Sequence, residues 1–230
     1  MRMILDMHSE KDYWLGTYEP GLQETIAEMV QSGMVAYDLG ANIGYVTLLL
    51  AKKIGEDGKV FAFEALPANF DRLVKNIELN NQSAMVFPVA AAVVDRSRLI
   101  KFLVGPSGGM GKAEGSAGRQ GFSYKNTLNV QGIALDDFIY QDGNPTPQVV
   151  KIDIEGGEVL AFPGMKRMLF EARPLILLEL HGPEAAKVAW NALSSAGYQI
   201  CLMQPGYPAV PSLDALEWKS YIVAIPMDLR

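Results

Sequence analysis

The amino-acid sequence predicts an α/β fold that is built on a parallel sheet. Short apolar runs typical of buried strands, such as those at 35–39, 59–63 and 148–154, alternate with segments whose apolar residues recur at helical spacing. A chain of 230 residues, 49% of them hydrophobic, is long enough for one such domain with a full core. This alternation builds a parallel sheet through right-handed crossovers, and ligands then bind at the carboxyl ends of the strands.

The first half of the chain is predicted to contain repeated strand and helix units. Residues 20–32 indicate a helix, because Pro20 suits the first turn and apolar side chains follow on one face. The strand at 35–39 leads to a second helical pattern from Tyr45, and the strand that Glu64 closes leads to a third. Further segments expected here are a helix at 66–80, a strand at 84–94 and an extended segment at 98–104.

The second half begins with a glycine-rich segment at 105–126. It has seven glycines and little hydrophobic periodicity, so it predicts a mobile loop, either a surface connection or a lid over the substrate. We expect one domain over 1–230, with a helical segment at 1–33. The elements expected beyond the loop are a short helix at 135–140, a strand at 148–154, a helical segment at 161–170 broken near Pro163 and Gly164, a strand at 174–180, a helix at 184–196, and strands at 198–203 and 219–225.

The residues between the first strand and its helix, DLGANIG at 38–44, form a tight turn of the kind that binds ligands. Gly40 and Gly44 let the backbone approach a ligand closely and tolerate positive φ angles. Among the non-glycine residues, asparagine adopts positive φ angles most readily, so Asn42 suits the same turn. The helix that follows directs its free N–H groups at an anionic group.

The glycines that this turn lacks indicate which nucleotide it holds. A dinucleotide fingerprint GxGxxG that began at Gly40 would need glycine at Asn42 and Tyr45, which argues against a cofactor with a pyrophosphate. S-adenosyl-L-methionine (SAM) has no phosphates, and Asp38 can bind its ammonium group. Glu64, which lies 26 residues after Asp38 at the end of the next strand, suits the ribose diol.

Five segments between about residues 19 and 203 carry a family resemblance. In chain order they read VAYDLGANIGYVTLLLA, VFAFEALPANFDRLVKNIELNN, IALDDFI, VVKIDIEGGEVLAFPGM and LILLELHG. Together they resemble the FkbM family of SAM-dependent methyltransferases, and KIDIEGGE is the most specific piece. The resemblance implies a Rossmann-like class I methyltransferase fold: a mostly parallel seven-stranded sheet with helices on both faces and an antiparallel last strand. It also implies methyl transfer, usually to oxygen, on a small-molecule or glycan-type acceptor.

Acidic residues and a histidine follow two of the predicted strands. Asp153 and Glu155 end one strand, two glycines and Glu158 come next, and Glu179 and His181 end another. Because burying unpaired carboxylates is unfavourable, we expect Asp153 and Glu155 to hold the SAM ammonium and the acceptor hydroxyl. Alternatively, these two acids and His181 could bind a divalent metal ion. Glu158 is expected only to place negative charge in the first turn of the next helix.

His181 is the first candidate for the base that removes the acceptor proton. Such a base contributes ~10²-fold or more to a displacement that depends mainly on positioning. Glu179 could orient the imidazole or point away from it. A histidine after a strand is more often a structural hydrogen-bonding residue, and this alternative stays open.

Small and aromatic residues predict the remaining walls of the site. Ala91 and Ala92 follow the third strand and leave room for a flat adenine, which Asn69 could edge. Phe70 is equally suited to the core. An N-terminal aromatic cluster could fasten its segment to the core, which we favour, or wall the acceptor pocket. This cluster consists of Tyr13, Trp14 and Tyr18.

The composition limits the binding partners and the cellular compartment that we expect for this protein. The net charge is −6 and no cluster of Lys and Arg occurs, so nucleic-acid binding is not expected. No apolar stretch reaches the ~20 residues of a membrane-spanning helix. Cys201, the single cysteine, lies in an apolar run and predicts a buried thiol without a disulfide. Because the first residues also lack a signal-peptide pattern, we expect a cytoplasmic protein.

Two other functions compete with methyl transfer. A nucleotide-dependent oxidoreductase could use the same kind of sheet, but it is disfavoured by the missing glycines and by the lack of a Tyr-x-x-x-Lys pair near the pocket. A SAM-binding module that has lost its chemistry is the second alternative.

Overall fold

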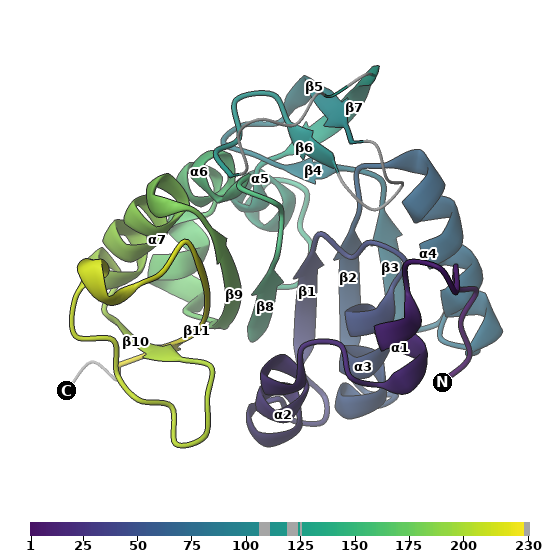
Figure 1. Ribbon diagram of the computed structural model, residues 1–230, viewed down its shortest axis with the longest axis horizontal. Coiled ribbons are helices and arrows are strands. Elements are labelled where there is room, and N and C mark those ends of the chain that lie inside the picture. The colour runs from purple at the N-terminus through teal and green to yellow at the C-terminus, as the bar shows by residue number, and fades with distance from the viewer. Residues whose placement is uncertain (106–110, 119–123, 125, 228–230) are drawn as a thin grey trace.

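Seven apolar runs of the chain form one large sheet. The computed structural model describes residues 1–105, 111–118, 124 and 126–227. The strand order is β10-β11-β9-β8-β1-β2-β3, and all neighbours pair in parallel except β11, which is antiparallel to both of its neighbours (Figure 1). The strands are β1 (Val35–Leu39), β2 (Lys59–Phe63), β3 (Val86–Val89), β8 (Val149–Ile152), β9 (Leu175–His181), β10 (Tyr198–Leu202) and β11 (Lys219–Pro226).

Helices cover both faces of this sheet (Figure 1). Successive strand residues point to opposite faces, so Tyr37 and Leu39 pack toward α5, α6 and α7, while Ala36 packs toward α2, α3 and α4. Each large apolar side chain buried in this way contributes roughly 1.5–3 kcal/mol. The helices are α1 (Lys11–Leu15), α2 (Pro20–Met29), α3 (Tyr45–Ile54), α4 (Pro67–Leu79), α5 (Leu135–Tyr140), α6 (Glu158–Ala161) and α7 (Pro183–Ser195), with short turns η1 (Phe162–Gly164), η2 (Met168–Ala172) and η3 (Leu213–Ala215).

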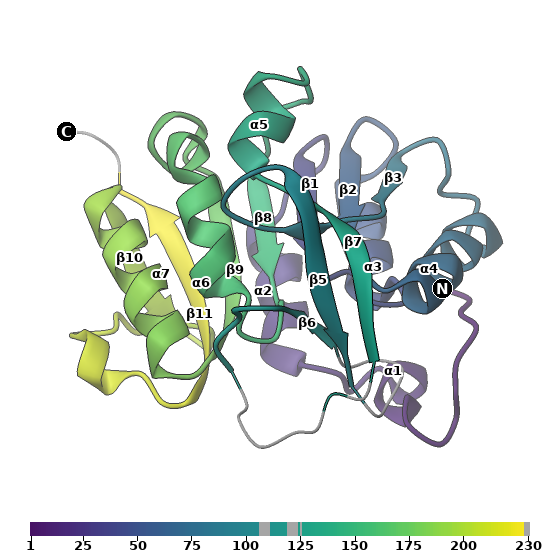
Figure 2. The same cartoon turned by 90° about the horizontal axis from the view of Figure 1, so that it is seen from above.

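A second, smaller sheet lies over one face of the large one, above β8, β1 and β2 (Figure 2). The order of its strands is β4-β7-β5-β6. Of these strands, the sequence predicts only β5 as a separate one. The strands are β4 (Ala92–Val93), β5 (Arg98–Val104), β6 (Gly111–Ala113) and β7 (Asn126–Ile133).

Two predicted segments differ from the structure in this region. The single strand predicted at 84–94 divides after Val89, so that β3 joins the large sheet and β4 joins the small one. In the predicted mobile loop, β6 pairs with β5. Residues 106–110, 119–123 and 125 of that loop lie outside the described residues.

Other boundaries shift by a few residues. Strand β8 ends at Ile152, so the two acids that follow it lie in a loop instead of alternating along a strand. The helical segment predicted at 161–170 is divided among α6, η1 and η2, as Pro163 and Gly164 led us to expect. Within the described parts of the chain, no helix combines the length and apolarity that a membrane crossing needs.

Candidate active site

A cavity of about 240 Å³ opens at the carboxyl ends of β1, β2 and β8. Its volume lies just below the roughly 300–1,000 Å³ typical of small-molecule sites. Segments far apart in the sequence form its walls, which explains why sequence spacing alone does not outline it. The predicted site residues that line it are Gly40, Asn42, Glu64, Asn69, Ala91, Ala92, Asp153 and Glu155.

The turn after β1 has the backbone that its residues predict. Gly40, Asn42 and Gly44 have φ angles of 79°, 50° and 93°. The amides of Gly40 and Ala41 donate to the carbonyl of Phe63, at 3.0 and 2.9 Å, which ties the turn to β2. A Cβ atom on Gly40 would lie 1.9 Å from the carbonyl oxygen of Asp153. Glycine at position 40 therefore lets the loops after β1 and β8 touch.

Glu64 is held from both sides by backbone amides. Its Oε2 accepts a hydrogen bond from the N–H of Asn42 and its Oε1 accepts one from the N–H of Leu66, both at 2.8 Å. Burial raises the pKa of this carboxyl, and the two amides oppose the shift. The remaining lone pairs of a carboxylate that lines the cavity can accept two hydroxyl groups, as the prediction of a ribose diol requires.

Asp38 does not line the cavity. Its Oδ2 accepts a hydrogen bond of 2.6 Å from Thr47, and Nζ of Lys151 lies 3.2 Å from its Oδ1. Lys151 also donates to the carbonyl of Gly40 at 3.0 Å. The structure therefore gives Asp38 a supporting role beneath the turn, where the sequence predicts contact with SAM. Gly44, the residue immediately before α3, likewise lies outside the cavity wall.

Lys151 is a site residue that the sequence analysis missed. Its side chain is 5% exposed and joins Asp38 to Asp153, whose Oδ2 lies 3.7 Å from Nζ. Burial opposes its charge, but the two carboxylates raise the pKa of the amine overall. One feature of the sequence could have identified Lys151, namely that it is a single charged residue inside the apolar run VVKI.

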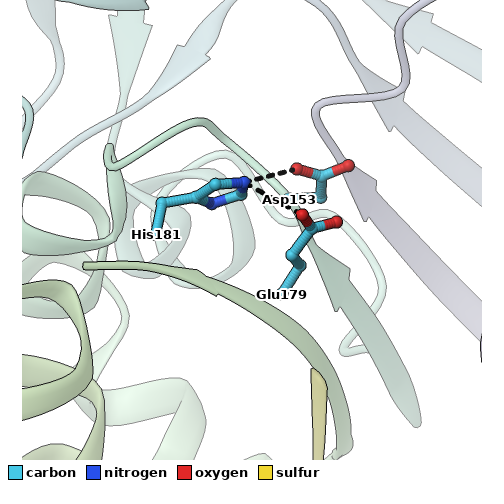
Figure 3. A group of neighbouring side chains, drawn as sticks. All are labelled: Asp153, Glu179 and His181. Carbon is cyan, nitrogen blue, oxygen red and sulfur yellow. Dashed lines mark ion pairs between the residues drawn. The ribbon is translucent and has the colours of Figure 1, made fainter. Parts of the chain in front are cut away.

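His181 lies between carboxylates at the end of β9. Its Nε2 is 3.1 Å from Oε1 of Glu179 and 3.8 Å from Oδ1 of Asp153 (Figure 3). The same nitrogen lies 3.8 Å from Glu155, and Nδ1 is 3.1 Å from Oε1 of Glu158. Burial opposes the charge, but the hydrogen bonds to Glu158 and Glu179 raise the pKa of His181 to about 10. A ring with this pKa is protonated near neutral pH, and both of its nitrogens face carboxylates, an arrangement that argues against the predicted role as base.

Glu158 differs from its predicted role. It does lie in the first turn of α6, but its side chain is fully buried and binds His181. It is therefore a structural partner of the imidazolium and not only a charge at a helix terminus. The sequence could not show this contact, because 23 residues separate the two side chains.

Glu19 and Glu179 form a carboxyl pair beside this histidine. Nζ of Lys219 lies 2.5 Å from Oε1 of Glu179. Burial and the charges of Glu179 and Asp153 raise the pKa of Glu19. Burial also opposes the charge of Glu179, but hydrogen bonds from His181, Glu19 and Lys219 lower its pKa overall. Two ionised carboxylates cannot hydrogen-bond to each other, so one of the pair must be protonated. Glu19, whose pKa is the higher of the two, holds that proton. The sequence does not single out Glu19.

The residues proposed for a metal ion already have cationic partners. Ligand atoms of Asp153, Glu179 and His181 lie within 4.8 Å of one another, while Glu155 does not belong to this group. Lys219 neutralises Glu179, Lys151 approaches Asp153, and a protonated imidazole cannot ligate a metal. A divalent cation at this place would have to displace both lysines from the carboxylates and the proton from the imidazole.

The N-terminal aromatic cluster both fastens its segment and walls the cavity. Tyr13 stacks on Tyr45, with ring centroids 4.9 Å apart, and Tyr13 and Tyr18 also line the cavity. Burial raises the pKa of Tyr13 to about 12. Trp14 is 68% exposed and lies outside the cavity wall. The two roles that the sequence left open therefore coexist.

Comparison with known proteins finds a family whose members match this chain. Residues 38–200 match the family described as the methyltransferase FkbM domain. The hexuronic acid methyltransferase AglP of Haloferax volcanii is 28% identical over 171 residues, which cover 74% of this chain and 66% of that protein. The chain thus spans slightly less than two thirds of the length of this curated relative.

Two solved structures share the fold. A methyltransferase FkbM from Methylobacillus flagellatus KT has a TM-score of 0.57 at 17% identity, over 86% of this chain and 45% of that chain. Precorrin-6y C5,15-methyltransferase from Geobacter metallireducens GS-15 has a TM-score of 0.53 at 15% identity, over 92% and 88%. With the observed strand order, these similarities confirm the predicted Rossmann-like class I methyltransferase fold.

Proposed function

Since this chain belongs to the FkbM family of methyltransferases, we propose that it transfers the methyl group of SAM to a hydroxyl oxygen of a small-molecule or glycan-type acceptor. The single observation that carries the proposal is Glu64, a buried carboxylate that two backbone amides hold in the wall of the cavity. A second polar atom also fits SAM. Oδ1 of Asn42 is buried and, among the described residues, has no hydrogen-bond partner.

Each end of SAM has matching residues in the cavity. Glu64 would bind the ribose diol, and Ala91 and Ala92 would leave space for the adenine. Asn42 and Asp153 would face the methionine end, where the carboxylate of Asp153 can take the ammonium group. When bound, SAM supplies an electrophilic methyl group, and the protein contributes position and charge.

The acceptor side of the proposal involves Asp153 and Glu155. Both line the cavity and both lie 3.8 Å from Nε2 of His181. Both ring nitrogens of His181 face carboxylates and its pKa is raised, which favours a charged group that holds these carboxylates in place over the predicted base. Burial raises the pKa of Asp153, opposed by Lys151, and the ammonium group of SAM would further favour its charged form. Glu155, the more exposed of the two, is then the carboxylate left to face the acceptor hydroxyl.

The relative's name supports the acceptor class. AglP is a hexuronic acid methyltransferase, and 74% of this chain aligns with it. A glycan-type acceptor with a free hydroxyl is consistent with that relationship. We therefore place the acceptor among hydroxylated metabolites or sugars.

Calorimetry with SAM tests the proposal, with NAD as the comparison ligand. We expect SAM and its product S-adenosylhomocysteine to bind and NAD to give no heat. A panel of hydroxylated acceptors should then release S-adenosylhomocysteine. No heat with SAM would refute the proposal, and binding without release across the panel would indicate a module that has lost its chemistry.

A further inference from the structure

The segment before α2, residues 1–18, runs along α4 and then reaches the cavity (Figure 1). Tyr13 and Tyr18 of this segment line the cavity, and Tyr13 stacks on Tyr45, the first residue of α3. The proposed function assigns no role to this segment. We call residues 1–18 the N-terminal strap.

Three polar side chains on α4 and at its end hold the main chain of the strap. Asn80 pairs with both main-chain groups of Arg2, since its Oδ1 accepts from the N–H at 2.9 Å and its Nδ2 donates to the carbonyl at 2.6 Å. Oδ1 of Asn76 accepts a hydrogen bond of 2.7 Å from the N–H of Ile4, and Arg72 donates to the carbonyl of Ile4 at 2.8 Å. A spacing of four residues places the three side chains in a row along one side of the helix.

Asn76 also contacts the turn that we assign to SAM. Its side chain is fully buried, and its Nδ2 donates to the carbonyl of Ile43 at 2.7 Å. Ile43 lies between Asn42 and Gly44 of that turn. One amide therefore uses its acceptor for the strap and its donor for the turn. Displacement of the strap would leave this buried acceptor without the N–H of Ile4, which is unfavourable.

The strap itself is held mainly by polar contacts. None of the five residues of α1, all of which the structure describes, is buried, and Trp14 is largely exposed. A salt bridge joins Arg72 to Glu10, with 2.6 Å between Nη2 and Oε2. Segments with few buried apolar contacts open at the low end of the free-energy range of a folded protein. A ligand that favours the docked strap can therefore shift its population.

We propose that docking of the strap on α4 and binding of SAM favour each other, and that Asn76 is the positioning residue that couples them. The inference rests on the proposed SAM site and goes beyond it by assigning a conformational step to the strap. In the docked state Tyr13 and Tyr18 complete the cavity wall, while Asn76 holds the carbonyl of Ile43. Because such coupling is reciprocal, releasing the strap must weaken SAM binding, and SAM must favour the docked strap.

Arg72→Met tests the coupling, because Arg72 contacts the strap and lies outside the cavity wall. We expect faster amide hydrogen exchange at residues 1–10, measured by mass spectrometry. Calorimetry should show SAM binding about 3- to 10-fold weaker, less than the full effect of the lost hydrogen bonds because Asn76 and Asn80 still hold the strap. Lys75→Met is the matched control, since it removes the same charge from an exposed position on α4 and should change neither quantity.

Adding SAM to the wild type should slow exchange at residues 1–10. A second variant, Asn76→Leu, is checked for folding by its melting temperature and tests the coupling residue. In its background Arg72→Met should weaken SAM binding by less than it does in the wild type, because the link between strap and turn is already removed. Equal losses in the two backgrounds would remove Asn76 from the coupling.

Two further outcomes would overturn the inference. One is faster exchange in Arg72→Met with unchanged SAM affinity, and the other is bound SAM that leaves exchange at residues 1–10 unchanged in the wild type. A wild type that does not bind SAM would instead refute the proposed function. The exchange of Arg72→Met measured without SAM would still show whether Arg72 holds the strap, so the two failures are distinguishable.

Discussion

At the residue scale, the site depends on charged groups that hold one another in place. Glu64 is fixed by two amides, Asp38 by Thr47 and Lys151, and His181 by two carboxylates. A buried charge is stable only when partners of this kind compensate the loss of water. Substituting one partner should therefore change both the charge and the position of the other.

Glu64→Gln tests the proposed contact with ribose. We expect SAM to bind about 10- to 100-fold more weakly, because one or more hydrogen bonds to a charged acceptor are lost. Calorimetry measures the effect, and Glu78→Gln on the exposed side of α4 is the matched control. Equal affinities of wild type and Glu64→Gln would remove Glu64 from the binding site.

The protonation of His181 predicts how stability depends on pH. Its pKa in the folded chain, about 10, is above the ordinary value of 6.5. The stabilisation is therefore complete below pH 6.5 and is lost as the pH rises toward 10, by up to ~1 kcal/mol per pH unit. Urea unfolding of wild type and His181→Gln should show a steeper fall for the wild type in this window. Parallel curves would mean that the histidine is neutral.

At the scale of elements, the site is made by loops that touch. The turn after β1 meets the loop after β8 because Gly40 has no side chain, and it meets the end of β2 through the carbonyl of Phe63. The cavity therefore depends on the distance between neighbouring parallel strands. Its geometry should respond to any atom inserted between these loops.

Gly40→Ala inserts such an atom. The new Cβ would lie 1.9 Å from the carbonyl oxygen of Asp153, so the loops must separate. Gly33→Ala is a matched control, because its φ of 81° is close to the 79° of Gly40 but no atom lies within 4 Å of the added Cβ. We expect Gly40→Ala to lose ~1–3 kcal/mol more in unfolding free energy than the control. SAM affinity should fall in Gly40→Ala alone. Similar losses in both variants would show that only backbone strain matters.

At the scale of the whole molecule, charge balance decides the chemistry of the site. The chain carries a net charge of −6, and the acids around His181 are partly compensated by this imidazolium and by Lys151 and Lys219. These cations come from β8, β9 and β11, so only the assembled sheet brings them together. A divalent metal ion would have to displace them.

We therefore predict that divalent cations have no part in folding or SAM binding. Millimolar chelator, Mg²⁺ or Mn²⁺ should leave both the melting temperature and the SAM affinity unchanged. Differential scanning calorimetry and titration calorimetry measure the two quantities. A rise in melting temperature with Mg²⁺ or Mn²⁺ that Asp153→Asn abolishes would restore the metal site that the sequence suggests.

Much of the large sheet could be predicted because its signals are local. Apolar runs such as VVKI form strands, and helical spacing identifies α3 and α4. The small sheet could not be predicted in the same way. Its strands β6 and β7 are stabilised by pairing with β5, a contact between segments that the sequence does not show to be neighbours. The chain divides into β3 and β4 for a similar reason, because β3 pairs within the large sheet and β4 pairs within the small one.

Local sequence patterns were enough to predict the fold class, the turn with positive φ angles at Gly40, Asn42 and Gly44, and the carboxylate of Glu64 in the cavity wall, because short-range sterics and residue periodicity govern these features. The surroundings of His181, Asp38 and Glu19 became visible only in the folded chain. Protonation depends on which charges lie within a few ångströms, and those charges come from distant strands.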